Sequence, residues 1–415
     1  MKTMKIRMFP GLFLLFLVLG IFIMQYLQSV LQGSTITLGI DLYPRWVGSK
    51  IALNGNSPYT LETRQQIWLA IYGSTDLPSG NPFGFYYPPA IVTILAPFIF
   101  MDISIQNAAV LWCAFLWALL SMFIVHWILS LPNLSKARLI IPLLLIGGWF
   151  FRPAFSNYIL GQFALFSVLM TITAWYSFEK EKPILAGIFC TFSLLKPSLT
   201  ILPVILLLVL YRRQLTGLIS FMISSLVLYL PPTLILGWWP PDFFADISNY
   251  ALENRVSWSI VDINTPAGLT WLFASSVLGM FGLFTKDTRI SMTSALALNA
   301  IFVPHTADYD LVVLILPLVY LSSIWLFAKN KKLLFSTLFF ILLWFPWVSL
   351  LFFLQTKTGN AVETWYRFIW LTYPNLILIS VLLTQFTSIR IALSRLWSDS
   401  KNKVHHKENS AISEI

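Results

Sequence analysis

Charge is the first thing that this sequence lacks. Only 11% of its 415 residues are Asp, Glu, Lys or Arg, whereas a typical soluble domain carries about 25%. Hydrophobic residues make up 57% of the chain. This composition excludes a disordered protein, a coiled coil and an ordinary cytosolic enzyme.

Cysteine is also scarce. Cys113 and Cys190 lie within apolar runs and form no CxxC pair, and no His/Cys cluster has metal-ligand spacing. The chain also has no Walker A sequence, no GxGxxG after a strand, no GxSxG and no HExxH. We therefore expect no disulfide framework, no metal and no other cofactor, and no cradle for a soluble nucleotide.

Long apolar runs recur through the chain, and they do not alternate as barrel strands would. They predict an all-α polytopic membrane protein, because lipid offers backbone groups no partners outside a helix or a closed barrel. About twelve spans are expected, near residues 8–30, 106–130, 138–155, 161–178, 183–196, 197–211, 215–236, 264–284, 289–304, 310–328, 332–354 and 366–388. Pro or Gly interrupts several of them, which favours either a central outward cavity or irregular helices packed together.

The positions of Lys and Arg predict the orientation. The N-terminus, Met1–Arg7, is short and basic, and placing it inside puts most of the 27 Lys and Arg in cytoplasmic segments. Both termini are then cytoplasmic in a plasma membrane, and the net charge of +10 does not indicate nucleic acid. Pro88–Phe100 is apolar but short, so it is expected as a juxtamembrane or re-entrant helix, with a full span as the alternative.

We expect one transmembrane domain, residues 1–395, followed by a polar, disordered cytoplasmic tail, residues 396–415. Its long outer loops are residues 31–105 and 237–263, and the first has helix-like stretches at about Tyr43–Asn54 and Leu61–Tyr72. Arg152–Gln162 is expected as a smaller outer loop. Any chemistry is expected on the outer face.

Three residues near the predicted outer surface are candidates for a site. Asp41 lies about ten residues past the first span, where a carboxylate can accept a proton from a hydroxyl; a solvated loop residue or a helix N-cap is the alternative. Tyr87 suits either sugar stacking or an interfacial aromatic belt. Gln162 can bond sugar hydroxyls, or it can cap or bridge helices.

Charged candidates lie at two further outer positions. Lys196, between two half-length apolar runs, has no local counter-charge, so it either holds a phosphate or snorkels to the interface. His305, Asp308 and Asp310 share one short loop. His305 can contact a phosphate or a hydroxyl, whereas either aspartate can instead cap the next helix.

Several short motifs occur in a fixed order. They are Asp41-Leu-Tyr43, Gly55-Asn-Ser-Pro-Tyr59, Tyr86-Tyr-Pro-Pro89, Gly161-Gln162, Ala186-Gly187 with Lys196-Pro197, and Pro304-His305 with Tyr309-Asp310. This order resembles glycosyltransferase family 87, the polyprenyl-phosphate-mannose-dependent mannosyltransferase-like proteins of GT-C architecture. The resemblance covers roughly residues 36–330. Leu42 stands where the family more commonly has Phe.

The resemblance implies a GT-C-type helix bundle that moves a sugar, with a mannose-like hexose favoured. The donor would be a polyprenyl-phosphate sugar, the acceptor a glycolipid or glycan, and the anomeric centre would be inverted on the non-cytoplasmic face. It assigns Asp41 as the base, with Lys196 and His305 at the donor, and Arg152, Arg255, Gln162 and Tyr87 are further candidates for binding it. The rival hypotheses are a secondary transporter or lipid-linked-sugar flippase and a non-catalytic scaffold. The oligomeric state is not predicted.

Overall fold

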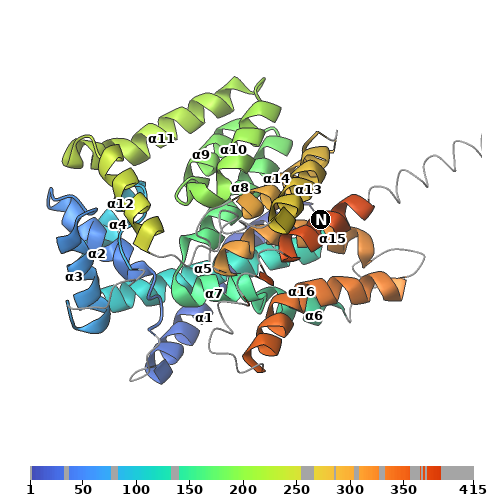
Figure 1. The fold of residues 1–415 in the computed structure, drawn as a ribbon, viewed down its shortest axis with the longest axis horizontal. Coiled ribbons are helices and arrows are strands. Elements are labelled where there is room, and N and C mark those ends of the chain that lie inside the picture. Colours follow the sequence, from blue (N-terminus) through green and yellow to red (C-terminus); the bar gives the residue numbers. More distant parts are fainter. Residues whose placement is uncertain are drawn as a thin grey trace, which may run out of the picture.

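The computed structural model describes residues 2–31, 37–75, 83–131, 140–253, 266–284, 287–302, 308–326, 332–355, 365, 368–369 and 372–384. All regular elements within these ranges are helices (Figure 1). In chain order they are α1 (Lys2–Leu31), α2 (Leu42–Leu53), α3 (Leu61–Tyr72), α4 (Ala90–Phe100), α5 (Ile105–Ser130), α6 (Ile140–Trp149), α7 (Arg152–Leu160), α8 (Phe163–Glu179), α9 (Pro183–Ser193), α10 (Pro197–Leu210), α11 (Leu215–Leu236), α12 (Pro240–Glu253), α13 (Pro266–Leu283), α14 (Thr288–Phe302), the 3-10 helix η3 (Asp308–Leu314), α15 (Ile315–Trp325) and α16 (Lys332–Gln355). A further apolar helix spans Thr372–Thr384.

Local sequence explains many of the helix ends. The Thr60 hydroxyl caps α3 by accepting a bond from the Thr63 amide at 3.3 Å, and Gly73 ends that helix at a φ of 71°. Ser104 caps α5 in the same way. Proline stands at or next to the first residue of α7, α9 and α10, where its missing N–H costs nothing.

The number of spans differs from the sequence prediction. Five described helices are long and apolar enough to cross a membrane, namely α1, α5, α11, η3 with α15, and α16. The pair α7 and α8 makes a sixth if it is one span, although it is bent by 118°. Other predicted spans contain shorter apolar helices, such as α9 and α10, which are divided at the Lys196-Pro197 break. The protein is therefore an all-helical membrane protein, and the count of about twelve and the GT-C arrangement stay predictions.

Single segments of the chain also differ from the sequence prediction. The expected span 138–155 and the expected loop Arg152–Gln162 are both wrong, because α6 ends at Trp149 and a new helix, α7, begins at Arg152. The two helices in the first outer loop are confirmed as α2 and α3. The proposed tail, residues 396–415, lies outside the described residues.

The helices gather into two groups. Figure 1 shows α2, α3, α4 and α12 together at one end of the long axis, and α13 to α16 towards the other, with α5 and α7 between them. One cluster of buried apolar side chains centres on α2 and α4, and a larger one extends from α5 through α7 to α10 into α14, η3, α15 and α16. The two predicted outer loops meet, because Arg64 of α3 forms an ion pair with Asp246 of α12. They therefore lie on the same side of the molecule, as a shared outer face requires.

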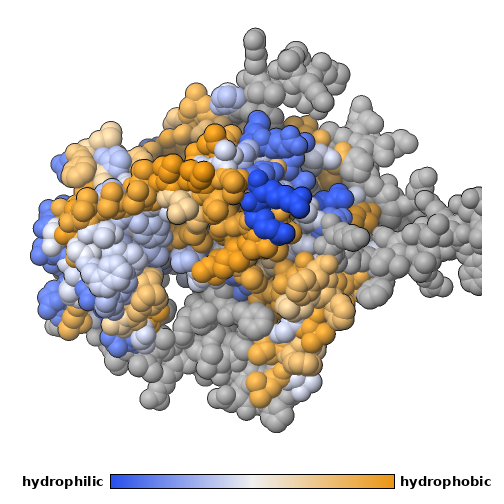
Figure 2. All heavy atoms as spheres, turned by 90° about the horizontal axis from the view of Figure 1, so that it is seen from above, coloured by the Kyte–Doolittle hydropathy of each residue, from blue (hydrophilic) through white to orange (hydrophobic). Residues whose placement is uncertain are grey.

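Apolar side chains remain exposed on the outside of the bundle. Figure 2 shows an apolar band that runs towards the centre of this face and meets a strongly hydrophilic patch just right of the centre, while the end carrying α2, α3 and α12 mixes hydrophilic and apolar residues. On α11, Ile219, Ile223 and Leu226 are all more than half exposed. Contiguous apolar exposure of this kind is suited to lipid contact.

Candidate active site

The segment before α2 lies against the break between α7 and α8. The backbone N–H of Gly39 donates to the Ile159 carbonyl and that of Asp41 to the Leu160 carbonyl, both at 2.9 Å. Gly39 and Gly161 both have positive φ, 67° and 73°, which glycine adopts without strain. A Cβ on Gly39 would lie 2.8 Å from the Cβ of Ala109. Glycine at these two positions therefore allows the close approach that brings Asp41 to the bend.

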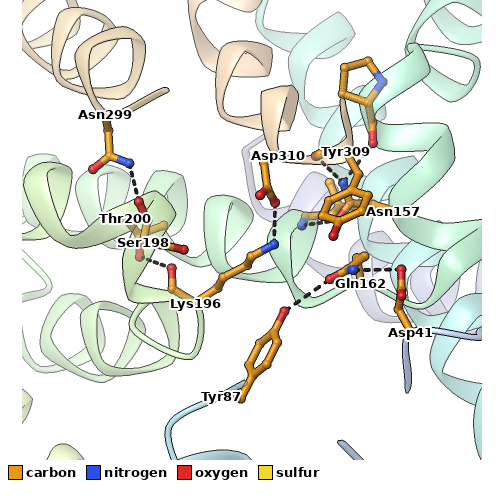
Figure 3. A network of polar contacts seen from close by, with 12 residues as sticks. Asp41, Tyr87, Asn157, Gln162, Lys196, Ser198, Thr200, Asn299, Tyr309 and Asp310 are labelled. Carbon is orange, nitrogen blue, oxygen red and sulfur yellow. Dashed lines mark hydrogen bonds and ion pairs between the residues drawn. The ribbon is translucent and has the colours of Figure 1, made fainter. Parts of the chain in front are cut away.

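Gln162, at that bend, connects the candidate residues from three parts of the chain. Its amide Nε2 donates to Asp41 Oδ2 at 2.7 Å, and its Oε1 accepts from the Tyr87 hydroxyl at 3.2 Å (Figure 3). Gln162 is 1% exposed and Tyr87 is 6% exposed. Asp41 does not cap α2, since its side chain makes no capping bond there. Tyr87 is buried with its hydroxyl bound to Gln162, so a surface aromatic belt does not describe it.

Arg45 is a member of this cluster that the sequence analysis missed. It lies one turn into α2, and its guanidinium donates to Gln162 Oε1 at 3.3 Å and stacks over the Tyr87 ring at 4.2 Å. Arg45 is only 8% exposed, and its Nε has no hydrogen-bond partner among the described residues. The sequence places Arg45 one helical turn after Asp41, but its burial and its contact with Gln162 appear only in the structure.

The surroundings of Asp41 change its acidity. Burial raises the pKa of the carboxyl group, while Arg45, the hydrogen bond from Gln162 and the more distant Lys196 act to lower it, and Asp308 raises it further. The net effect is a pKa above the ordinary value of 3.8. A carboxylate with a raised pKa is a better proton acceptor than a solvated aspartate.

Lys196 has no counter-charge nearby in the sequence, but the structure pairs it with a distant one. Its ammonium, at the break between α9 and α10, forms an ion pair with Asp310 of η3 and lies 4.7 Å from the centre of the Tyr309 ring (Figure 3). The side chains of Lys196 and Asp310 are 13% and 4% exposed. The partner is 114 residues away in the chain, so local sequence could not reveal it. Simple snorkelling to the interface does not describe this lysine.

Arg152 and Asp308 form a second ion pair beside the first. Arg152 Nη2 lies 3.1 Å from Asp308 Oδ2, which also accepts a bond from the Ser156 hydroxyl at 3.2 Å. The Arg152 guanidinium lies 4.9 Å from the Trp347 ring centre. Each of the two aspartates of η3 therefore forms an ion pair with a cation from another part of the described chain.

The side chain of Asn157 connects the helices of the site by binding to their backbone atoms. Its Nδ2 donates to the Tyr309 carbonyl at 2.7 Å and its Oδ1 accepts from the Leu165 amide at 2.8 Å, which ties α7 and α8 to η3 (Figure 3). Lys196 and Asp308 both act electrostatically on Asp41. The carboxylate, the amide and the two ion pairs therefore belong to one site.

Two predicted site residues, Arg255 and His305, lie outside the described residues. Within the described part of the chain, no group of three or more His, Cys, Asp and Glu side chains is placed to hold a metal ion. What the described site offers is a proton acceptor, hydrogen-bonding groups for hydroxyls, and cations for an anionic group.

Comparison with known proteins identifies the family. The model of glycosyltransferase family 87 matches residues 85–353, which is more than half of the chain. That range includes Tyr87, Gln162, Lys196 and the η3 aspartates, whereas Asp41 and Arg45 precede it. No curated protein and no solved structure matched the chain. The family match and the apolar helices together show that the chain belongs to glycosyltransferase family 87 and is a membrane glycosyltransferase.

Proposed function

We propose that this glycosyltransferase transfers a mannose-like hexose from a polyprenyl-phosphate donor to a lipid- or glycan-borne acceptor, with inversion. The observation that carries the proposal is the Asp41 carboxylate, held by Gln162 with Arg45 and Lys196 nearby in an otherwise apolar protein. One base and several cations are what transfer from a phosphate leaving group requires. We place the reaction on the outer face of the plasma membrane, with both termini in the cytoplasm.

In the proposed reaction, the acceptor hydroxyl oxygen forms a bond to the anomeric carbon. The bond from that carbon to the phosphate oxygen breaks, and its electron pair leaves with the lipid phosphate. The proton of the attacking hydroxyl passes to Asp41. Because attack and departure take place on opposite faces of the sugar, the configuration at the anomeric carbon inverts.

Cations beside the leaving phosphate stabilise its charge in a site that contains little water. Lys196 can do this while bound to Asp310, because an ammonium has three donors. Arg45 adds a guanidinium whose described hydrogen bond is to the neutral amide of Gln162. Arg152, Arg255 and His305 are further candidates for this role, and we assign Gln162 and Tyr87 to the binding of sugar hydroxyls.

The decisive experiment replaces Asp41 with asparagine. Asp41→Asn keeps the size of the side chain but removes the proton acceptor, so turnover should fall by roughly 10²–10⁴-fold. The assay is sugar transfer from synthetic polyprenyl-phosphate sugars by purified protein in detergent, where a transporter or flippase would form no product. Donor binding should survive, because the carboxylate is not expected to bind the donor.

Asp102→Asn is the matched control. Asp102 is an exposed aspartate between α4 and α5, so its replacement should leave turnover unchanged. A folded Asp41→Asn protein with near-normal turnover would remove Asp41 from the mechanism. Absence of transfer by the wild-type protein from any lipid-phosphate sugar would reject the proposed donor class.

A further inference from the structure

An apolar cavity of about 350 Å³ lies between α1, α2, α4, α5, α8 and α9. All thirteen residues that line it are apolar or aromatic, and six of them carry aromatic rings. Leu42 and Trp46 line it from α2, Leu95 and Phe98 from α4, and Trp112 from α5. Phe98 is 44% exposed, so the α4 wall also reaches the outer surface of the protein. The volume lies within the range of small-molecule binding sites, about 300–1,000 Å³.

The cavity adjoins the polar site. Leu42 and Leu195, which line it, are the chain neighbours of Asp41 and Lys196. Trp112, another wall residue, donates its indole N–H to the Gly161 carbonyl at 3.0 Å, and Gly161 directly precedes Gln162. Arg45 lies on α2 between the wall residues Leu42 and Trp46. A molecule with its anionic group at the polar site would therefore have its apolar part beside this cavity.

We propose that this cavity binds the isoprenoid chain of the donor, specifically the units nearest the phosphate. The proposal rests on the proposed function, since it assigns a site to the lipid part of that donor. Its position next to both Asp41 and Lys196 favours the donor, whose phosphate and chain are directly joined. The many rings suit a branched chain, because methyl groups pack closely against aromatic faces.

The volume of the cavity limits how many isoprenoid units of the donor the protein can bind. A cavity of about 150 Å³ accommodates one benzene molecule, so this cavity accommodates roughly three five-carbon units. Further units would extend past the cavity into lipid. The affinity for isoprenyl phosphates should therefore rise up to about three units and change little beyond that.

The test measures binding of isoprenyl monophosphates without sugar to the full-length protein in lipid nanodiscs. The probes are dimethylallyl, geranyl, farnesyl and geranylgeranyl phosphate, with one to four units. Each of the first additions should tighten binding by about tenfold or more, because removing even two of the five carbons of a unit from water has that effect. The fourth unit should add little, and n-dodecyl phosphate, a straight chain, should bind more weakly than farnesyl phosphate.

Ala108→Phe fills the cavity, since Ala108 is a buried wall residue on α5. It should weaken farnesyl phosphate binding by about a hundredfold, to the level of dimethylallyl phosphate, whose own affinity should not change. Leu129→Phe, at an exposed position of the same helix, is the matched control and should bind like the wild type. Phe98→Ala removes a half-exposed wall residue instead, and it should selectively weaken the longer probes even if Ala108→Phe fails to fold.

Three results would each overturn the assignment. They are equal binding of all chain lengths by the wild type, an equal loss for all lengths in both variants, and binding of dodecyl phosphate as tight as that of farnesyl phosphate. The last would assign the cavity to a straight-chain lipid. Because these probes carry no sugar and need no turnover, the outcome is independent of whether sugar transfer itself is observed.

Discussion

Replacing only one partner of the Lys196–Asp310 ion pair should reduce the stability of the fold much more than the pair itself contributes to it. Both side chains are largely buried, at 13% and 4% exposed. Either single variant, Lys196→Met or Asp310→Asn, leaves one charge without its partner, and such a loss typically costs roughly 3–5 kcal/mol. The double variant leaves no such charge, so its loss of stability should be clearly smaller than the sum of the two single losses.

The assay is thermal unfolding of the four proteins in one detergent at one heating rate, because membrane-protein unfolding is often irreversible. Each single variant should unfold several degrees below the wild type, and the double variant should recover part of that difference. The exposed pair Arg289 and Asp287 provides a control cycle, since its side chains are 64% and 34% exposed. Its coupling should be at most about 1 kcal/mol.

Measuring the donor KM of the same variants then separates a structural role of Lys196 from a role in donor binding. If the Lys196 ammonium also holds the donor phosphate, Lys196→Met and the double variant should both lose it. The expected cost is roughly 1.5–3 kcal/mol, or about ten- to a hundredfold in donor KM. Asp310→Asn keeps the ammonium and should keep donor use. Strictly additive unfolding shifts would refute the coupling, and an unchanged donor KM in Lys196→Met would make this lysine purely structural.

Three other predictions concern the same site and its orientation. Burial raises the pKa of Asp41, so the ionised base is lost, and kcat/KM falls, as the pH is lowered through a value above 3.8. Gln162→Leu removes a hydrogen bond that favours the ionised form, so it should shift this acidic side of the pH profile to higher pH. Arg45→Met should shift the acidic side of the pH profile in the same direction, whereas Arg45→Lys, which retains the charge, should shift it less. An unchanged pH profile in Arg45→Met would contradict the coupling of Arg45 to Asp41. An impermeant thiol reagent should label Asn56→Cys but not Lys182→Cys in intact cells, with little background from the buried Cys113 and Cys190; the reverse pattern would overturn the orientation.

Features that depend on neighbouring residues could be predicted from the sequence. Composition and apolar runs predicted an all-helical membrane protein, and local pattern predicted α2 and α3. The start of α7 was missed, although Arg152-Pro153 is a typical helix-start signal, because a continuous apolar run was interpreted as one span. The short apolar runs 183–196, 197–211 and 289–304 were predicted close to their observed bounds as α9, α10 and α14, but hydropathy alone does not show whether such short helices cross the membrane.

The pairings within the site depend on distant parts of the chain and could not be predicted. Asp41 and Gln162 were both candidates, but their hydrogen bond joins residues 121 positions apart. Lys196 shows no local counter-charge in the sequence, because its partner, Asp310, is 114 positions away. Arg45 was overlooked, since nothing in the local sequence distinguishes a buried arginine on a juxtamembrane helix from a solvated one.

The backbone bonds from Gly39 and Asp41 to Ile159 and Leu160 also bear on the order of assembly during synthesis. The carboxylate emerges from the ribosome early, but its partners are made more than a hundred residues later. Closing such a long loop in a flexible chain would cost roughly 4 kcal/mol in entropy, and the packing of α1 on α5 shortens the loop that remains to be closed. A nascent chain that ends before Gly161 therefore carries the carboxylate without the geometry that makes it a base, and the site becomes complete only after α7 and α8 are in place.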